Sequence, residues 1–132
     1  MNTTEINRDQ FVKLLKNSNT KPFVMLNLLK FKKDVGRKSY ARYLQEATKF
    51  LEDVGGKLLF LSQPQELLNG TETWDLLMLV QYPSRKAFMD MAGNPDYLKI
   101  HNFREAALEN AVLYATDEIS LSDFFREEVE LT

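Results

Sequence analysis

The run from Pro22 to Phe31 most constrains what this chain can fold into, because it is apolar on both of its alternating faces. In an extended strand, successive side chains point to opposite sides. One side would carry Phe23, Met25, Leu29 and Phe31, and the other would carry Val24, Leu26 and Leu28. Because neither side suits water, the run predicts a central strand covered by helices on one face and by a second layer on the other. In a chain of 132 residues we expect that layer to be another copy of the protein.

Composition narrows the classes of function. We expect a single domain over 1–132, with its core at about 22–117, because this length suffices for one hydrophobic core. The absence of cysteine excludes thiol catalysis, disulfides and sulfur-bound zinc. A single histidine and a net charge of -2 argue against an imidazole metal cluster and against nucleic acid. We expect no metal and no cofactor. Because the sequence shows no long apolar run and no export signal, we also expect no membrane partner and a cytoplasmic location.

Residues that favour helix ends and turns divide the chain into alternating helices and strands. Asn7 predicts the start of a short helix within 1–20, and Ser39 predicts the cap of a second helix that stops at Gly55-Gly56. A strand from Lys57 ends at Leu61 or continues to Leu68; because it would contain Pro64, it should lie at an edge or carry a bulge. Asn69-Gly70 predicts a hairpin turn into a second central strand, which we expect over 72–82.

The second half repeats this alternation. Ser84 and Asn94-Pro95 predict a helix broken at Gly93 and running to about Glu109, followed by a last strand over 111–116. The tail, 118–132, is acidic with scattered apolar residues and is compatible with either a strand or a short helix. The order strand, helix, strand, strand, helix, strand predicts an α+β, ferredoxin-like antiparallel sheet, whose uncovered face would pair with a second copy to form a dimeric α/β barrel.

Several short sequences, in order along the chain, resemble those of a known family. They are Phe23-Val24-Met25-Leu26-Asn27-Leu28-Leu29-Lys30-Phe31, Ser39-Tyr40-Ala41-Arg42-Tyr43, Gly55-Gly56-Lys57, Trp74-Asp75, Gln81-Tyr82-Pro83-Ser84, Asn94-Pro95-Asp96-Tyr97 and 101–108. Together they resemble an uncharacterised domain-of-unknown-function family of the dimeric α/β-barrel superfamily. The resemblance implies that fold. The superfamily includes cofactor-free monooxygenases, muconolactone isomerases, haem-binding enzymes and non-catalytic modules, so it implies no single reaction.

Five residues are candidates for a site. Asn27 interrupts an apolar strand, and its amide needs a partner, which is either a ligand or another group of the protein. His101 and Arg104 are three residues apart on one helix face and would hold an anion together, or would form an ordinary surface. In the resembled family an adjacent basic residue is expected where Phe103 stands. Tyr40 and Tyr43 would orient a carbonyl or phenolate, or would pack in the core with their hydroxyls at the rim.

These observations give two hypotheses of function. The first is a homodimer that binds a small organic molecule, with Asn27, Tyr40 and Tyr43 as ligand contacts. Its catalytic form would be a cofactor-independent monooxygenase or isomerase-like enzyme with His101 as acid or base and Arg104 stabilising an anion. The second is a non-catalytic structural or regulatory dimer whose tail engages a partner.

Overall fold

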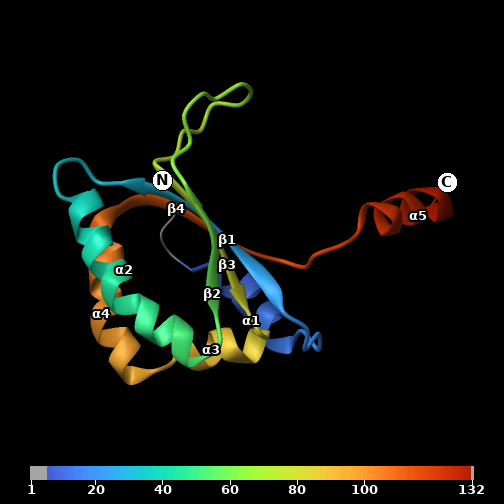
Figure 1. The fold of residues 1–132 in the computed structure, drawn as a ribbon, viewed down its shortest axis with the longest axis horizontal. Helices are drawn as coiled ribbons and strands as arrows, with labels where there is room; N and C mark the ends of the chain where they lie inside the picture. Colours follow the sequence, from blue (N-terminus) through green and yellow to red (C-terminus); the bar gives the residue numbers. More distant parts are fainter. Residues whose placement is uncertain (1–5, 132) are drawn as a thin grey trace.

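The computed structural model describes residues 6–131, so 1–5 of the expected N-terminal segment and Thr132 of the expected tail lie outside the described residues. The elements follow in the order α1 (Arg8–Lys16), β1 (Phe23–Phe31), α2 (Gly36–Asp53), β2 (Lys57–Ser62), β3 (Leu76–Tyr82), α3 (Arg85–Ala92), α4 (Pro95–Ala107), β4 (Leu108–Thr116) and α5 (Leu121–Leu131). In Figure 1, α1 to β4 form the body, and α5 stands apart from it.

The four strands form one antiparallel sheet in the order β2-β3-β1-β4. The prediction that the two strands with apolar residues on both faces occupy the centre is therefore confirmed, since β1 and β3 are neighbours. The strand that precedes Pro64 lies at an edge, as predicted. Within 6–131, the βαββαβ order around this sheet makes the fold ferredoxin-like and α+β.

One face of the sheet is covered by helices (Figure 1). The strand residues that point to this face alternate with half-buried ones and form about half of the buried set, namely Phe23, Met25, Asn27, Leu29, Leu76, Met78, Val80 and Tyr82. Helices α2 and α4 pack against each other over it, and α1 packs beside α3. Burial of this alternating set is the main source of stability expected for such a layer.

Among residues 6–131, no helix covers the opposite face of the sheet (Figure 1). Its residues follow from the strand register, in which Leu26 lies between Leu79 and Tyr114, and Leu28 lies between Leu77 and Val112. Tyr114 is 64% exposed, and Phe60, which pairs with Leu79, is 52% exposed. We call this surface the open face, made of Val24, Leu26, Leu28, Phe60, Leu77, Leu79, Val112 and Tyr114.

Three boundaries differ from the sequence predictions. Strand β2 ends at Ser62, because Pro64 has no N–H to continue the ladder. Strand β3 begins at Leu76 rather than near 72, since the carboxylate of Asp75 accepts a hydrogen bond from Phe31 N at 2.8 Å and turns the preceding chain out of the sheet. The connection 63–75 is consequently irregular, and β4 begins at Leu108, earlier than predicted.

Helix α2 begins at Gly36, three residues before the predicted cap at Ser39. A Cβ atom on Gly36 would lie 2.6 Å from the carbonyl oxygen of Ala107 and 2.8 Å from Cβ of Phe31. Glycine therefore permits the start of α2 to touch the end of both β1 and α4. The hydroxyl of Ser39 instead donates to the carbonyl oxygen of Phe103 at 3.2 Å and ties α2 to α4.

The tail is a helix rather than a strand. After Thr116 the chain continues through an extended segment to α5, which lies away from the sheet and the helix layer (Figure 1). Among residues 6–131, no helix is long and apolar enough to cross a membrane.

Candidate functional site

The predicted tyrosines lie between the sheet and the helices, and they meet a third tyrosine there. Tyr40 and Tyr43 on α2 are only 2% and 7% exposed, so neither hydroxyl lies at the rim. The hydroxyl of Tyr43 lies 2.6 Å from the hydroxyl of Tyr97 on α4, and the two form a buried hydrogen bond. The Tyr40 and Tyr43 ring centroids are 5.3 Å apart. We call Tyr40, Tyr43 and Tyr97 the tyrosine cluster.

Burial makes the tyrosine hydroxyls poor acids. Removal from water raises the pKa of Tyr40 to about 12, and the nearby guanidinium of Arg104 partly opposes this effect. Burial also raises the pKa of Tyr43, with a further contribution from Tyr97. These phenols therefore stay protonated near neutral pH and can act as hydrogen-bond donors and acceptors.

His101 lies on α4 one turn after Tyr97, with the two ring centroids 5.9 Å apart. Its Nε2 lies 3.1 Å from Oε1 of Glu105, while its Nδ1 is buried and has no hydrogen-bond partner among the described residues. Burial, followed by the charge of Arg104, lowers the pKa of His101 from its ordinary value of 6.5. In its neutral form the imidazole then carries its proton on Nε2, facing Glu105. The lone pair on Nδ1 is therefore free to accept a proton.

Arg104 supplies a donor three residues after His101 on α4. Its Nη2 is also buried without a hydrogen-bond partner in the part of the chain that the structure describes. Its charge acts on both Tyr40 and His101, so its guanidinium lies near the tyrosine cluster and the imidazole. Buried polar atoms are normally paired with protein, water or ligand, so two unpaired atoms of opposite character three residues apart on one helix need explanation.

Asn27 lies on the helix-covered side of β1 and is 6% exposed. Its side-chain amide donates to the carbonyl oxygen of Met25 at 3.4 Å, which is long for a hydrogen bond. The structure thus brings four of the five predicted residues together around Tyr97. It gives the Asn27 side chain no hydrogen bond to them among the described residues.

Three residues of this region were not singled out from the sequence. Tyr97 and Glu105 lie four residues before and after His101, so helical spacing was a signal that could have found them. Tyr82 is buried at the end of β3, and its pKa is raised by burial and then by Tyr97 and Tyr40. Its position on the covered side follows from strand alternation.

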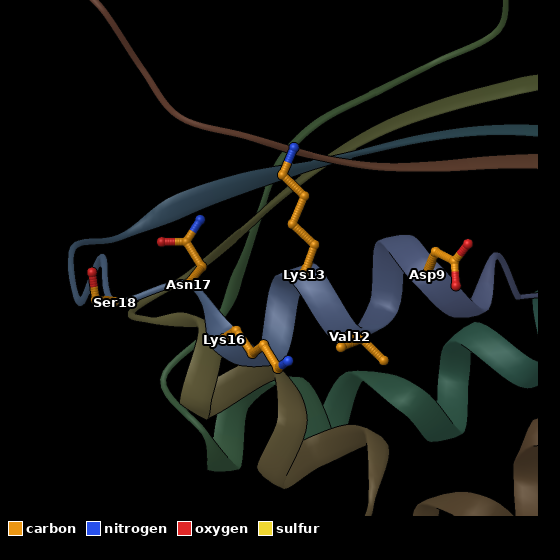
Figure 2. Close-up of a pocket in the computed structure, with 6 residues that line it drawn as sticks. All are labelled: Asp9, Val12, Lys13, Lys16, Asn17 and Ser18. Carbon is orange, nitrogen blue, oxygen red and sulfur yellow. The ribbon is translucent and has the colours of Figure 1, made fainter.

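The candidate site is a packed cluster rather than an open cavity. The groove in Figure 2, of about 580 Å³, is shallow and lies elsewhere, lined by Asp9, Val12, Lys13, Lys16, Asn17 and Ser18 of α1 and the turn after it. A surface formed by one helix cannot enclose a molecule, so we assign it no site. Among residues 6–131, no group of three or more histidine, cysteine, aspartate or glutamate side chains can hold a metal ion.

Comparison with known proteins gives a family and a fold. The model of the family described as "Domain of unknown function (DUF1330)" matches residues 28–116. A protein of unknown function from Rhodopseudomonas palustris, RPA0582, has a similar structure, with a TM-score of 0.85, 27% identity, and coverage of 91% of this chain and 99% of that one. No curated protein matches the chain.

Two further solved structures share the fold alone. One is a dimeric ferredoxin-like protein of unknown function from Jannaschia, with a TM-score of 0.61 and 11% identity, over 74% of this chain and 99% of that one. The other is SnoaB, a cofactor-independent oxygenase from Streptomyces nogalater, with a TM-score of 0.52 and 10% identity, over 76% of this chain and 97% of that one.

Proposed function

Because this chain belongs to the family described as "Domain of unknown function (DUF1330)", whose model matches residues 28–116, we propose that it is a homodimer that binds a small organic molecule between its sheet and its helices. The observation that carries the proposal is the pair of buried, unpaired atoms, Nδ1 of His101 and Nη2 of Arg104. An acceptor and a donor with no partners are complementary to a ligand that offers a hydroxyl or acidic C–H beside a carbonyl or phenolate oxygen.

The open face supports the proposed homodimer. Leu26, Leu28 and Tyr114 lie side by side on a sheet surface that no helix in the described part of the chain covers. A contiguous apolar surface of this kind is typical of an interface. The Jannaschia protein with the same fold is described as dimeric, which supports the same arrangement here.

The site favours proton transfer as its chemistry. In the proposed step, neutral His101 takes a proton from the ligand at Nδ1, which leaves an imidazolium and an enolate or phenolate. Arg104 then stabilises the new negative charge on oxygen, and the hydroxyl of Tyr40 orients the same oxygen. Asn27 and Tyr43 complete the proposed contacts with the ligand. The residues themselves require no cofactor for this step, in keeping with isomerase-like or cofactor-independent oxygenase chemistry, and SnoaB has such an activity on the same fold.

The opening for the ligand would lie along α4. The His101 side chain is 31% exposed, whereas Asn27, Tyr40 and Tyr43 are buried, so a ligand would enter past the His101–Glu105 pair. A small outward movement of α4 would create space for the ligand. The cytoplasmic location remains a prediction from the sequence.

A thermal-shift screen of small enolisable carbonyl and phenolic compounds tests this proposal. Compounds that raise the melting temperature of the wild type should fail to raise that of Arg104→Gln and His101→Ala. The matched control is Arg42→Gln on α2, whose guanidinium lies over the ring of Phe103, 4.7 Å from its centroid, and should not affect the shift. Equal shifts for all four proteins would contradict the proposed site.

The non-catalytic dimer remains the second hypothesis. It is favoured by the exposed phenylalanines of α5, which are unlike an ordinary surface. A wild-type protein that binds no compound, yet retains another protein through residues 118–132, would support it over the ligand hypothesis.

A further inference from the structure

The segment 117–131, which we call the arm, presents an apolar stripe that is largely exposed in its own chain. Leu121, Phe124 and Phe125 share one side of α5 through their three- and four-residue spacing, and they are 68%, 46% and 57% exposed. The opposite side carries an ion pair between Asp123 and Arg126 at 3.0 Å. Such an amphipathic helix is stable when its apolar side is covered.

An ion pair and a hydrogen bond hold the start of the arm against the body. Both carboxylate oxygens of Asp117 accept hydrogen bonds from Arg85, at 3.0 and 3.2 Å. Arg85 is itself 8% exposed and lies over the ring of Phe23 at 4.9 Å. Just before this, the Thr116 hydroxyl donates to the carbonyl oxygen of Val24 at 2.8 Å. The arm is therefore anchored at the end of β4 and directed away from the body (Figure 1).

A second uncovered apolar surface lies on the edge strand β2. The register places Leu58 opposite Val80 and Leu61 opposite Met78, so both point to the helix-covered side of the sheet. Val80 and Met78 are buried, yet Leu58 and Leu61 are 45% and 50% exposed. The helix layer therefore stops short of β2. A second copy packed on the open face would not cover these two leucines, because they lie on the other side of the sheet.

The arm cannot readily cover β2 of its own chain. Strands β2 and β4 are opposite edges of the sheet, three strand spacings or about 14 Å apart. The four residues 117–120 span at most about 14 Å when fully extended. They would also have to pass around α2 and α4, which lie over the intervening strands.

Charge favours another copy as the partner. Residues 117–132 contain six acidic residues and one basic residue, which gives a net charge of -5. The remaining 116 residues contain 16 basic and 13 acidic residues, which gives a net charge of +3. The arm of one copy is thus attracted to the body of another. Two copies can pack by their open faces about a two-fold axis that is parallel to the strands. In such a pair, the β4 edge of one copy lies over the β2 edge of the other.

We propose that α5 is an exchanged arm, which lays Leu121, Phe124 and Phe125 on the helix-covered side of the edge strand β2 of a second copy. The partner surface is centred on Leu58 and Leu61. This inference rests on the proposed homodimer and adds a second, reciprocal interface to it. The open faces would bring the two sheets together, and the exchanged arms would cover the strand that each helix layer leaves exposed.

Disulfide trapping tests the exchange, because the chain has no cysteine of its own. Differently tagged Leu61→Cys and Phe125→Cys chains are co-expressed and oxidised, and the linked product is measured on a non-reducing gel. We expect a species that carries both tags. The matched control replaces Phe125→Cys by Arg126→Cys, one residue along on the far side of α5, and should give several-fold less product. Leu58→Cys provides a second position on β2.

Light scattering of the same samples separates this proposal from the dimer itself. A dimer without the mixed product overturns the arm exchange and leaves the homodimer standing. The same holds if a chain carrying both Leu61→Cys and Phe125→Cys links only within itself. A monomer of wild-type chains overturns both proposals together.

Discussion

The hydroxyl oxygens of Tyr43 on α2 and Tyr97 on α4 lie 2.6 Å apart in the buried layer between the helices and the sheet. Each is the described partner of the other, so removal of either hydroxyl leaves a buried polar group unpaired. We expect Tyr43→Phe and Tyr97→Phe each to lower the free energy of unfolding by about 1–3 kcal/mol. Urea unfolding of both variants measures these losses.

The double variant Tyr43→Phe/Tyr97→Phe is the control for that prediction. It removes both members of the pair, so no hydroxyl is left without a partner, and the loss should be much smaller than the sum of the single losses. Additive losses would mean that the two hydroxyls do not depend on each other.

The titration of His101 tests the electrostatics of the candidate site. Its pKa should lie below 6.5, because burial and then Arg104 disfavour the imidazolium. Arg104→Met should raise this pKa, and Glu105→Gln should lower it further, since Glu105 acts in the opposite direction. The measurement is simple because the chain has a single histidine, whose ring signals can be followed by NMR against pH. A wild-type midpoint above 6.5 would contradict the site geometry.

The same shift predicts how stability changes with pH. Because the folded state binds this proton less readily than the unfolded state, the contribution of His101 is fully present above pH 6.5 and is lost as the pH falls through the lower pKa of the folded state. His101→Gln should therefore flatten the fall in stability below pH 6.5. Thermal melts of the two proteins between neutral and mildly acidic pH provide the comparison.

The Arg85–Asp117 pair should contribute more than the other ion pairs. Arg85 is buried and its Nε already lacks a hydrogen-bond partner among the described residues, so Asp117→Asn leaves its charge poorly compensated. We expect a loss of about 1–3 kcal/mol in the free energy of unfolding. Asp90→Asn breaks the exposed pair with Lys86 and should cost about 0.5 kcal/mol or less. Similar losses for the two variants would show that Arg85 finds another partner.

Asn27→Leu separates a structural role from a binding role. The buried amide has one long hydrogen bond, so an apolar side chain of similar size should leave the free energy of unfolding unchanged or raise it by about 1 kcal/mol. If Asn27 contacts a ligand, the same variant should lose the thermal shift given by compounds that stabilise the wild type. A strongly destabilised variant would instead identify the amide as a structural requirement.

The sequence was sufficient to predict the sheet because its signals are local and periodic. The two-sided apolar strands and the proline at 64 indicated which strands are central and which is at the edge, and the observed order agrees. The late start of β3 after Asp75 depends on the contact of Asp75 with Phe31, and the early start of α2 at Gly36 depends on its contact with Ala107. Both partners are distant in sequence. Periodicity carries no information about such contacts.

The site was predicted less completely for the same reason. Tyr40, Tyr43, His101 and Arg104 were each recognisable by residue type and helical spacing. Their meeting at Tyr97 depends on how α2 packs on α4, which the sequence pattern of either helix does not specify. The conformation of the tail was undecided because its apolar spacing has no covering layer in its own chain to select a strand or a helix.

Native mass spectrometry of the protein purified from its own host tests the central claim most directly. The account predicts a mass of two chains plus a discrete small-molecule adduct, with the adduct lost in Arg104→Gln and retained in Arg42→Gln. Two bare chains would support the dimer and leave the ligand site without support. A bare monomer would contradict the account at its starting point, because the apolar open face around Leu26 and Leu28 would then have no partner.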